Sequence, residues 1–262
     1  MMSPLIMAFT GKGGVGKTVL SALAGMLFIE EDKRVLFIDA DPAMGLALSL
    51  GAGNFKTIGQ AREEIIRQAR IASSIEEKER LGEVLDYVLL ETLYERPGYS
   101  LIVMGQTDTL GCYCPVNGLL RRTIGSLAAN YDVVIIDAEA GIEQVNRQVV
   151  ESVQYPVIVT DNSLRGIKTA LMIHARIKDV PAMRPVQTGV IFNRVESPDP
   201  GLVETITSAG MLDYEYIAPC PEIGELDRKG APLFDISPDA GPLSQLRRIL
   251  RSQGMLHERR TG

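Results

Sequence analysis

Short apolar runs alternate along the chain with longer segments in which apolar residues recur every three or four positions. The short runs have the length and β-branched content of strands, whereas the longer segments, such as 19–29 and 166–177, have helical spacing. This alternation predicts an α/β fold with a mostly parallel central sheet and helices on both faces. The predicted strands are 5–9, 34–38, 100–104, 133–136, 157–160 and 189–192, with a last short strand before Pro219.

The pattern changes between residues 56 and 97, where Glu, Arg and Leu are abundant at helical spacing. This predicts a helical insertion, which is either a solvated layer or a docking surface for a partner protein. No Pro-, Gly- or Ser-rich linker marks a domain boundary, and 262 residues that are 45% hydrophobic suffice for one sizeable core. We therefore expect a single domain over residues 1–262.

Charge and hydropathy exclude several functional classes. A net charge of −6 and a pI near 5.1 are the opposite of what binding to a nucleic-acid backbone requires. No apolar run approaches the ~20 residues that cross a bilayer, and the N-terminus lacks the basic region of a signal peptide. Three cysteines do not form a secreted disulfide framework. The sequence predicts a cytoplasmic protein without nucleic-acid or membrane partners.

Residues 11–18 read GKGGVGKT and lie between a predicted strand and a predicted helix. They match the phosphate-binding loop G-x-x-x-x-G-K-[ST], whose glycines let backbone N–H groups point at phosphate oxygens beside the positive end of a helix. Lys17 is expected to reach the β- and γ-phosphates of ATP, and the Thr18 hydroxyl to bind Mg²⁺. The predicted nucleotide-binding residues here are Gly11, Lys12, Gly13, Gly14, Val15, Gly16, Lys17, Thr18 and Val19.

Two acidic turns follow predicted strands and therefore belong at the edge where parallel sheets bind ligands. The first contains Asp39 and Asp41 in the sequence DADP, and the second runs from Asp137 to Gly141 in the sequence DAEAG. A carboxylate at this edge is suited to accepting a proton from the water that attacks a γ-phosphate. The two turns strengthen the prediction of an Mg-ATP site.

The loop GKGGVGKT resembles the deviant Walker A motif of the class formed by MinD, ParA and the nitrogenase iron protein. The resemblance implies that Lys12 crosses a dimer interface and contacts the phosphates of the other subunit, much as an arginine finger does. It also implies catalytic roles for Lys17, for Asp41 as the residue that orients or deprotonates the attacking water, and for Asp137, which would hold Mg²⁺ through a water. Asp39 would lie near the magnesium shell.

The same resemblance implies contacts to the γ-phosphate and to the base. Gly141 would offer its N–H to the γ-phosphate and change conformation when that group leaves. Asn193, followed by Arg194, occupies the position at which the class places an asparagine against the adenine edge. A proline-containing loop lies beside the base in this class, and here it consists of Pro219, Cys220 and Pro221.

Cys112 and Cys114 lie two residues apart in a segment that reads GCYCPVNGLLR. Pro115 biases Cys114 toward an extended backbone, in which both thiols can converge on one soft ion. Two thiolates fill half of a tetrahedral zinc or nickel site, and a twofold axis would supply the other half. The pair therefore predicts a homodimer that shares one Ni²⁺ or Zn²⁺ ion, with two buried cysteines or a local disulfide as the alternatives.

The cysteine segment, together with Asp137, Glu139, Gly141 and Glu143, resembles the nickel-insertion ATPases that mature carbon monoxide dehydrogenase, whose relatives serve acetyl-CoA synthase. The resemblance extends over nearly the whole chain. It implies a homodimer that binds nickel between its subunits, couples its ATP state to metal delivery, and has one of these nickel enzymes as its client. The residues after Glu143 depart from the carbon monoxide dehydrogenase pattern, which leaves the client open.

Two other functions remain open. An ATPase related to the nitrogenase iron protein would hold an iron–sulfur cluster between two chains, although that class uses one cysteine from each of two separated loops. A MinD- or ParA-like positioning ATPase would use residues 242–260 as a basic amphipathic membrane helix, although such a segment is more often the last helix packed on the sheet. His174, within a predicted helix, is expected to be a packed or surface residue rather than a ligand.

Overall fold

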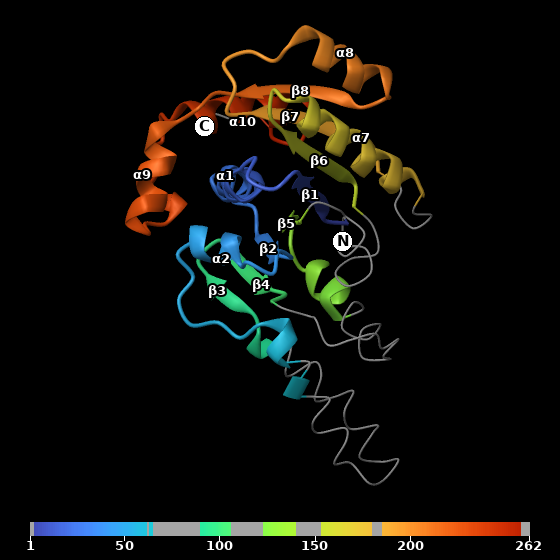
Figure 1. Cartoon of the computed structure of the whole chain (residues 1–262). Helices are drawn as coiled ribbons and strands as arrows, with labels where there is room; N and C mark the ends of the chain where they lie inside the picture. Colours follow the sequence, from blue (N-terminus) through green and yellow to red (C-terminus); the bar gives the residue numbers. More distant parts are fainter. Residues whose placement is uncertain are drawn as a thin grey trace.

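The computed structural model describes residues 3–61, 63–64, 90–105, 123–139, 153–179 and 185–257. At its centre lies an eight-stranded sheet in the order β3-β4-β2-β5-β1-β6-β7-β8 (Figure 1). The strands are β1 (Leu5–Gly11), β2 (Val35–Asp39), β3 (Tyr94–Arg96), β4 (Tyr99–Val103), β5 (Val133–Asp137), β6 (Tyr155–Thr160), β7 (Gly189–Asn193) and β8 (Leu212–Ile217).

All neighbouring strands run parallel except β3, which pairs with β4 in the antiparallel sense. The predicted α/β fold with a mostly parallel sheet is therefore confirmed. The sequence pattern misses β3, because Glu95 and Arg96 are exposed and its three residues form no apolar run. The prediction of helix over 56–97 is therefore wrong at its C-terminal end, where β3 lies. Residues 58–61, 63–64 and 90–91 within that range are helical.

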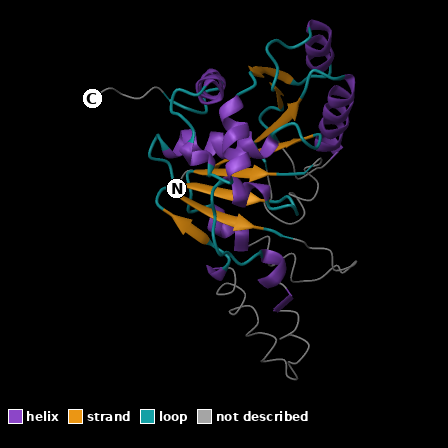
Figure 2. Ribbon diagram, turned by 60° about the vertical axis from the view of Figure 1, so that its left-hand side comes forward, coloured by secondary structure: helices purple, strands orange, loops and turns teal. Residues whose placement is uncertain are grey.

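Two hydrophobic cores lie on opposite faces of the sheet, because successive side chains of a strand point to opposite sides. On β1, for example, Ile6 belongs to one core and Met7 to the other. Figure 2 shows the helical layers against the strands. The first core is covered by α7 (Leu164–Asp179) and α8 (Pro200–Ser208). The second is covered by α1 (Lys17–Ile29), the 3-10 helix η1 (Leu233–Asp235) and α10 (Gly241–Ser252).

Two predictions about helices can be compared directly with the fold. The apolar side of α10 is buried in the second core, where Leu243, Leu246, Ile249 and Leu250 are each at most 2% exposed. This segment is therefore the last helix packed on the sheet, and its apolar side is not presented as a membrane surface. Within the described ranges, no helix is both long and apolar enough to cross a membrane. His174 of α7 is buried, so of the packed and surface positions expected for it the structure shows the packed one.

The register of the sheet brings the predicted site residues to one edge. Asp137, the last residue of β5, pairs with Phe9 of β1 and with Asp39, the last residue of β2. Gly11, the last residue of β1, pairs with Val159 of β6. Because parallel strands end at the same edge, the phosphate-binding loop and both acidic turns leave the sheet side by side.

Candidate nucleotide-binding site

A cavity of about 940 Å³ opens at this edge of the sheet, a volume at the upper end of the usual range for small-molecule sites. Four separate segments that the sequence predicts for the site contribute to its lining. Residues of α2 (Gly45–Ser49) and, after Pro221, of α9 (Pro221–Lys229) also line it, and the sequence pattern does not single these out. The predicted residues that line it are Gly13, Gly14, Gly16, Lys17, Thr18, Val19, Asp41, Asn193, Arg194, Pro219, Cys220 and Pro221. The structure thus brings these residues together, while their individual roles stay predictions.

Two glycines of the phosphate-binding loop stand where a side chain would clash. Gly11 has a φ of +144°, and a Cβ there would lie 2.1 Å from the carbonyl oxygen of Val159. Gly16 has a φ of +91°, and a Cβ there would lie 2.4 Å from the side-chain nitrogen of Asn193. The backbone of the loop therefore packs directly against β6 and the end of β7, in conformations that favour glycine.

The start of α1 is arranged to receive an anion. Its N-cap residue, Gly16, provides no side-chain cap for the first N–H groups of the helix. A Cβ at Gly13 or Gly14 would meet nothing within 4 Å, so this stretch of backbone faces open space. Lys17 is only 8% exposed, and its Nζ donates to the carbonyl oxygen of Lys12 at 3.4 Å. A cradle of N–H groups beside a buried lysine fits the phosphates of a nucleotide.

Asp137 and its neighbours fit a divalent cation. The carboxylate is 1% exposed, its Oδ1 accepts a hydrogen bond from the Ser21 hydroxyl at 3.4 Å, and its Oδ2 has no partner among the described residues. Burial, partly offset by a hydrogen bond from Thr18, raises the pKa of Asp137 to about 7. A buried carboxylate with an unused oxygen, beside a threonine hydroxyl, is suited to Mg²⁺, which would compensate its charge.

Asp39 organises the first acidic turn. Its Oδ1 accepts a hydrogen bond from the N–H of Asp41 at 3.2 Å, and its Oδ2 accepts one from the N–H of Ala47 at 3.0 Å. Asp39 is fully buried, and burial raises its pKa to about 6 despite these hydrogen bonds. Asp41 lines the cavity, and its Oδ1 accepts a hydrogen bond from Ala43. Asp39 thus holds the turn in place, while Asp41 presents a carboxylate to the cavity.

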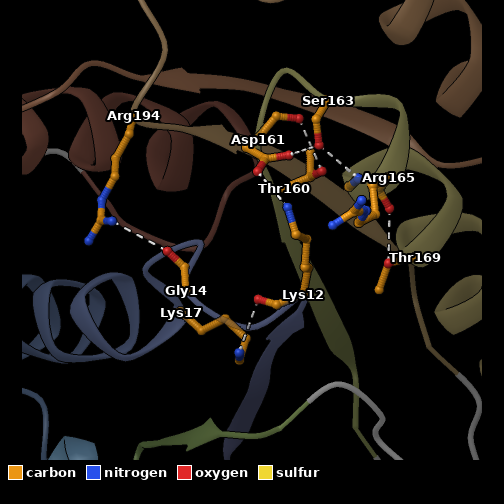
Figure 3. A network of polar contacts seen from close by, with 10 residues as sticks. Lys12, Gly14, Lys17, Thr160, Asp161, Ser163, Arg165, Thr169 and Arg194 are labelled. Carbon is orange, nitrogen blue, oxygen red and sulfur yellow. Dashed lines mark hydrogen bonds and ion pairs between the residues drawn. The ribbon is translucent and has the colours of Figure 1, made fainter.

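Asn193 and Arg194 connect the end of β7 to the phosphate-binding loop. Asn193 is 5% exposed, and its Nδ2 donates to the carbonyl oxygen of Val15 at 2.7 Å. Arg194 has a φ of 60°, and its Nη1 donates to the carbonyl oxygen of Gly14 at 3.3 Å (Figure 3). Both side chains therefore brace the loop in addition to lining the cavity.

Lys12 behaves differently from Lys17. Among the described residues that line the cavity, Lys17 is present and Lys12 is not. The Nζ of Lys12 donates to Oδ2 of Asp161 at 3.0 Å, and Figure 3 shows this side chain extending toward Asp161 and away from Lys17. The sequence pattern does not single out Asp161. It directly follows the predicted strand 157–160, however, as Asp39 follows the predicted strand 34–38, so the rule that selected the acidic turns applies to it as well.

The remaining predicted site residues, Gly141, Cys112 and Cys114, lie outside the described residues. Within the part of the chain that the structure describes, no group of three or more His, Cys, Asp or Glu side chains is placed to hold a metal ion. The Ni²⁺ or Zn²⁺ site at the cysteine pair therefore stays a prediction.

Comparison with known proteins identifies the family. The family described as an AAA domain matches residues 4–184, which contain the phosphate-binding loop and both acidic turns. The chain belongs to this family. It is 34% identical over 238 residues to the uncharacterised ATP-binding protein MJ0685 of Methanocaldococcus jannaschii, with 88% of this chain and 91% of that protein covered. It is 27% identical over 242 residues to the carbon monoxide dehydrogenase accessory protein CooC of Rhodospirillum rubrum, with 81% and 90% covered.

Solved structures show the same fold. A ParA family ATPase from Chlorobium tepidum superimposes with a TM-score of 0.67 at 17% identity, covering 94% of this chain and 97% of that one. The MinD cell division protein of Aquifex aeolicus superimposes with a TM-score of 0.65 at 20% identity, covering 97% and 99%. The chain is therefore an ATP-binding P-loop ATPase of the class that contains MinD, ParA and CooC.

Proposed function

We propose that this ATPase is a nickel-insertion protein: a homodimer that hydrolyses ATP to ADP and phosphate and delivers a metal ion to carbon monoxide dehydrogenase or acetyl-CoA synthase. The observation that carries the proposal is the pair Cys112 and Cys114 in a chain that is 27% identical to CooC. Nucleotide hydrolysis alone has no use for two closely spaced thiols. One such pair from each of two copies would complete a four-sulfur site for a soft ion.

The position of the cysteine segment in the chain supports a link to the nucleotide. Strand β4 precedes this segment and ends at Val103, which pairs with Asp39. The N–H of Met104 also donates to the carbonyl oxygen of Asp39 at 2.8 Å. The chain that continues toward Cys112 and Cys114 thus leaves the sheet, at its last described residues Met104 and Gly105, beside the first acidic turn. Only seven residues separate Met104 from Cys112 in the sequence, and we propose that a movement of that turn on hydrolysis is transmitted to the thiols along them.

The proposed cycle assigns a task to each group in the site. Lys17 and the N–H groups of the loop bind the phosphates. Thr18 and Asp137 would hold Mg²⁺, whose charge would stabilise the transferred phosphoryl group. Asp41 accepts a proton from the attacking water. Lys12 reaches the nucleotide of the second copy, so that the dimer closes when both copies hold ATP. Because ATP and metal favour the same closed dimer, each raises the affinity for the other.

Replacing Cys112 and Cys114 together by serine tests the proposal. The double variant is expected to lose stoichiometric binding of nickel and zinc while it still binds ATP, because a serine hydroxyl does not replace a thiolate ligand. Cys220→Ser is the matched control, since it removes the third thiol and should retain the metal. Metal per chain is measured by elemental analysis after dialysis. Unchanged metal content in the double variant would refute the assignment.

A second candidate is an ATPase that holds an iron–sulfur cluster between the same thiols, because two cysteine pairs also supply the four sulfur ligands of such a cluster. Iron and acid-labile sulfide in anaerobically purified protein would identify this function, whereas the nickel-insertion proposal expects neither. A MinD- or ParA-like positioning role has less support, since the apolar side of α10 is buried. Co-sedimentation with liposomes in the presence of ATP tests that role.

A further inference from the structure

Lys12 is held in an ion pair that the proposed cycle has to break. Its Nζ lies 3.0 Å from Oδ2 of Asp161, and the two side chains are 31% and 37% exposed. Lys12 is not among the described residues that line the nucleotide cavity of its own chain. The lysine that is predicted to serve a second copy therefore has a partner within its own chain.

Asp161 is fixed at the junction of β6 and α7. Its Oδ1 accepts a hydrogen bond from the Ser163 hydroxyl, and the Ser163 oxygen accepts one from the N–H of Gly166 at 3.0 Å (Figure 3). A Cβ on Gly166 would lie 2.4 Å from Oδ1 of Asp161, so the carboxylate occupies space that only glycine leaves free. The carboxylate is thus positioned by the first turn of α7 and does not depend on Lys12 for its orientation.

The fold itself places the two charges together. Gly11 pairs with Val159, so Lys12 and Asp161 follow the ends of neighbouring strands. Partial burial acts to raise the pKa of Asp161, but hydrogen bonds from Ser163 and Lys12 outweigh it and lower that pKa. The carboxylate is therefore ionised at neutral pH, and Lys12 has a counterion before any nucleotide arrives.

We propose that Asp161 is a positioning residue that holds Lys12 within its own chain until ATP is bound. The inference rests on the proposed dimer, in which Lys12 contacts the nucleotide of the second copy. By symmetry, closure of that dimer separates two Lys12–Asp161 pairs, so the pairs raise the ATP concentration at which the dimer forms. A partly exposed ion pair is weak and is screened by salt. The Lys12–Asp161 pair can therefore break when the dimer closes and form again when it opens.

Asp161→Asn tests this role, because it keeps the shape of the side chain and removes its charge. The half-point of dimerisation, measured by sedimentation velocity against a non-hydrolysable ATP analogue with Mg²⁺, is expected to fall roughly threefold to tenfold. The difference from the natural protein should shrink in 0.5 M salt. Asp179→Asn, at the exposed far end of α7, is the matched control and should not shift the half-point. An unchanged or higher half-point for Asp161→Asn would overturn the proposal.

The coupling between the two residues is tested by repeating the substitution in a Lys12→Gln background. Asp161→Asn should then have no further effect on dimerisation, because the Lys12 ammonium that Asp161 pairs with is absent. An equal effect in both backgrounds would show that Asp161 has a merely structural role. A second readout uses nucleotide-free monomer, in which the acylation rate of Lys12 is followed by mass spectrometry. We expect acylation to be several-fold faster in Asp161→Asn, and equal rates would contradict the hold. This readout remains decisive if the natural protein never dimerises, a result that would instead refute the dimer of the proposed function.

Discussion

At the scale of single residues, the nucleotide site contains groups that oppose folding on their own. Asp137 and Asp39 are both buried, and burial raises their pKa values to about 7 and about 6. Two neighbouring buried carboxylates without a cation lower the free energy of unfolding, and a bound cation restores it. These carboxylates therefore destabilise the folded protein until a cation binds, as residues of functional sites commonly do.

Asp137→Asn is expected to stabilise the protein in the absence of magnesium. The pKa of Asp137 is raised in the fold from 3.8 to about 7, so the unfolded chain loses this proton at lower pH than the folded chain does. The free energy of unfolding therefore falls as the pH rises from about 4 to about 7, by as much as ~4 kcal/mol for a shift of this size. An asparagine does not titrate, so the Asp137→Asn variant should not show this pH-dependent loss. At pH 8 its free energy of unfolding should exceed that of the natural protein.

Urea unfolding in EDTA at several pH values measures the effect. With Mg²⁺ and ATP the order should reverse, because only the natural protein has the carboxylate that Mg²⁺ would compensate. A variant that is less stable than the natural protein at pH 8 in EDTA would mean that Asp137 is stabilised by a partner other than a bound cation.

At the scale of elements, the sequence predicts the parts of the site better than their arrangement. The ends of β2 and β5 could be located because the apolar runs before Asp39 and Asp137 are buried on both faces of the sheet. The order of the strands could not be predicted, because no local sequence pattern indicates that β1 lies between β5 and β6. The pairing of Lys12 with Asp161 depends on that order, because the two residues are 149 positions apart in the sequence.

The role of α10 as a packed helix can be tested through Leu246, which is fully buried. Leu246→Ala is expected to lower the free energy of unfolding by about 2–5 kcal/mol, because it removes contacts in the core and leaves a cavity. Leu212→Ala is the matched control, since Leu212 is 43% exposed on β8 and should cost less than ~1 kcal/mol. Equal and small losses in urea unfolding would place the apolar side of α10 outside the core and revive the membrane-helix alternative.

At the scale of the whole molecule, two features bear on the proposed dimer. The pair Cys112 and Cys114 would supply half of the proposed tetrahedral metal site. In the described part of the chain, Lys12 faces Asp161 and not the cavity that Lys17 lines. One feature comes from the sequence and the other from the structure, and both fit the proposed twofold dimer, in which the same surface of each copy would meet the other.

Native mass spectrometry of the protein with nickel, with and without Mg-ATP, tests this dimer most directly, because it reports the number of chains and of metal ions in one particle. We expect a dimer that carries one nickel ion and two nucleotides, together with monomers that carry no nickel. Monomers that each hold one nickel ion, or ATP-bound dimers that hold none in excess metal, would contradict a metal site shared between two copies.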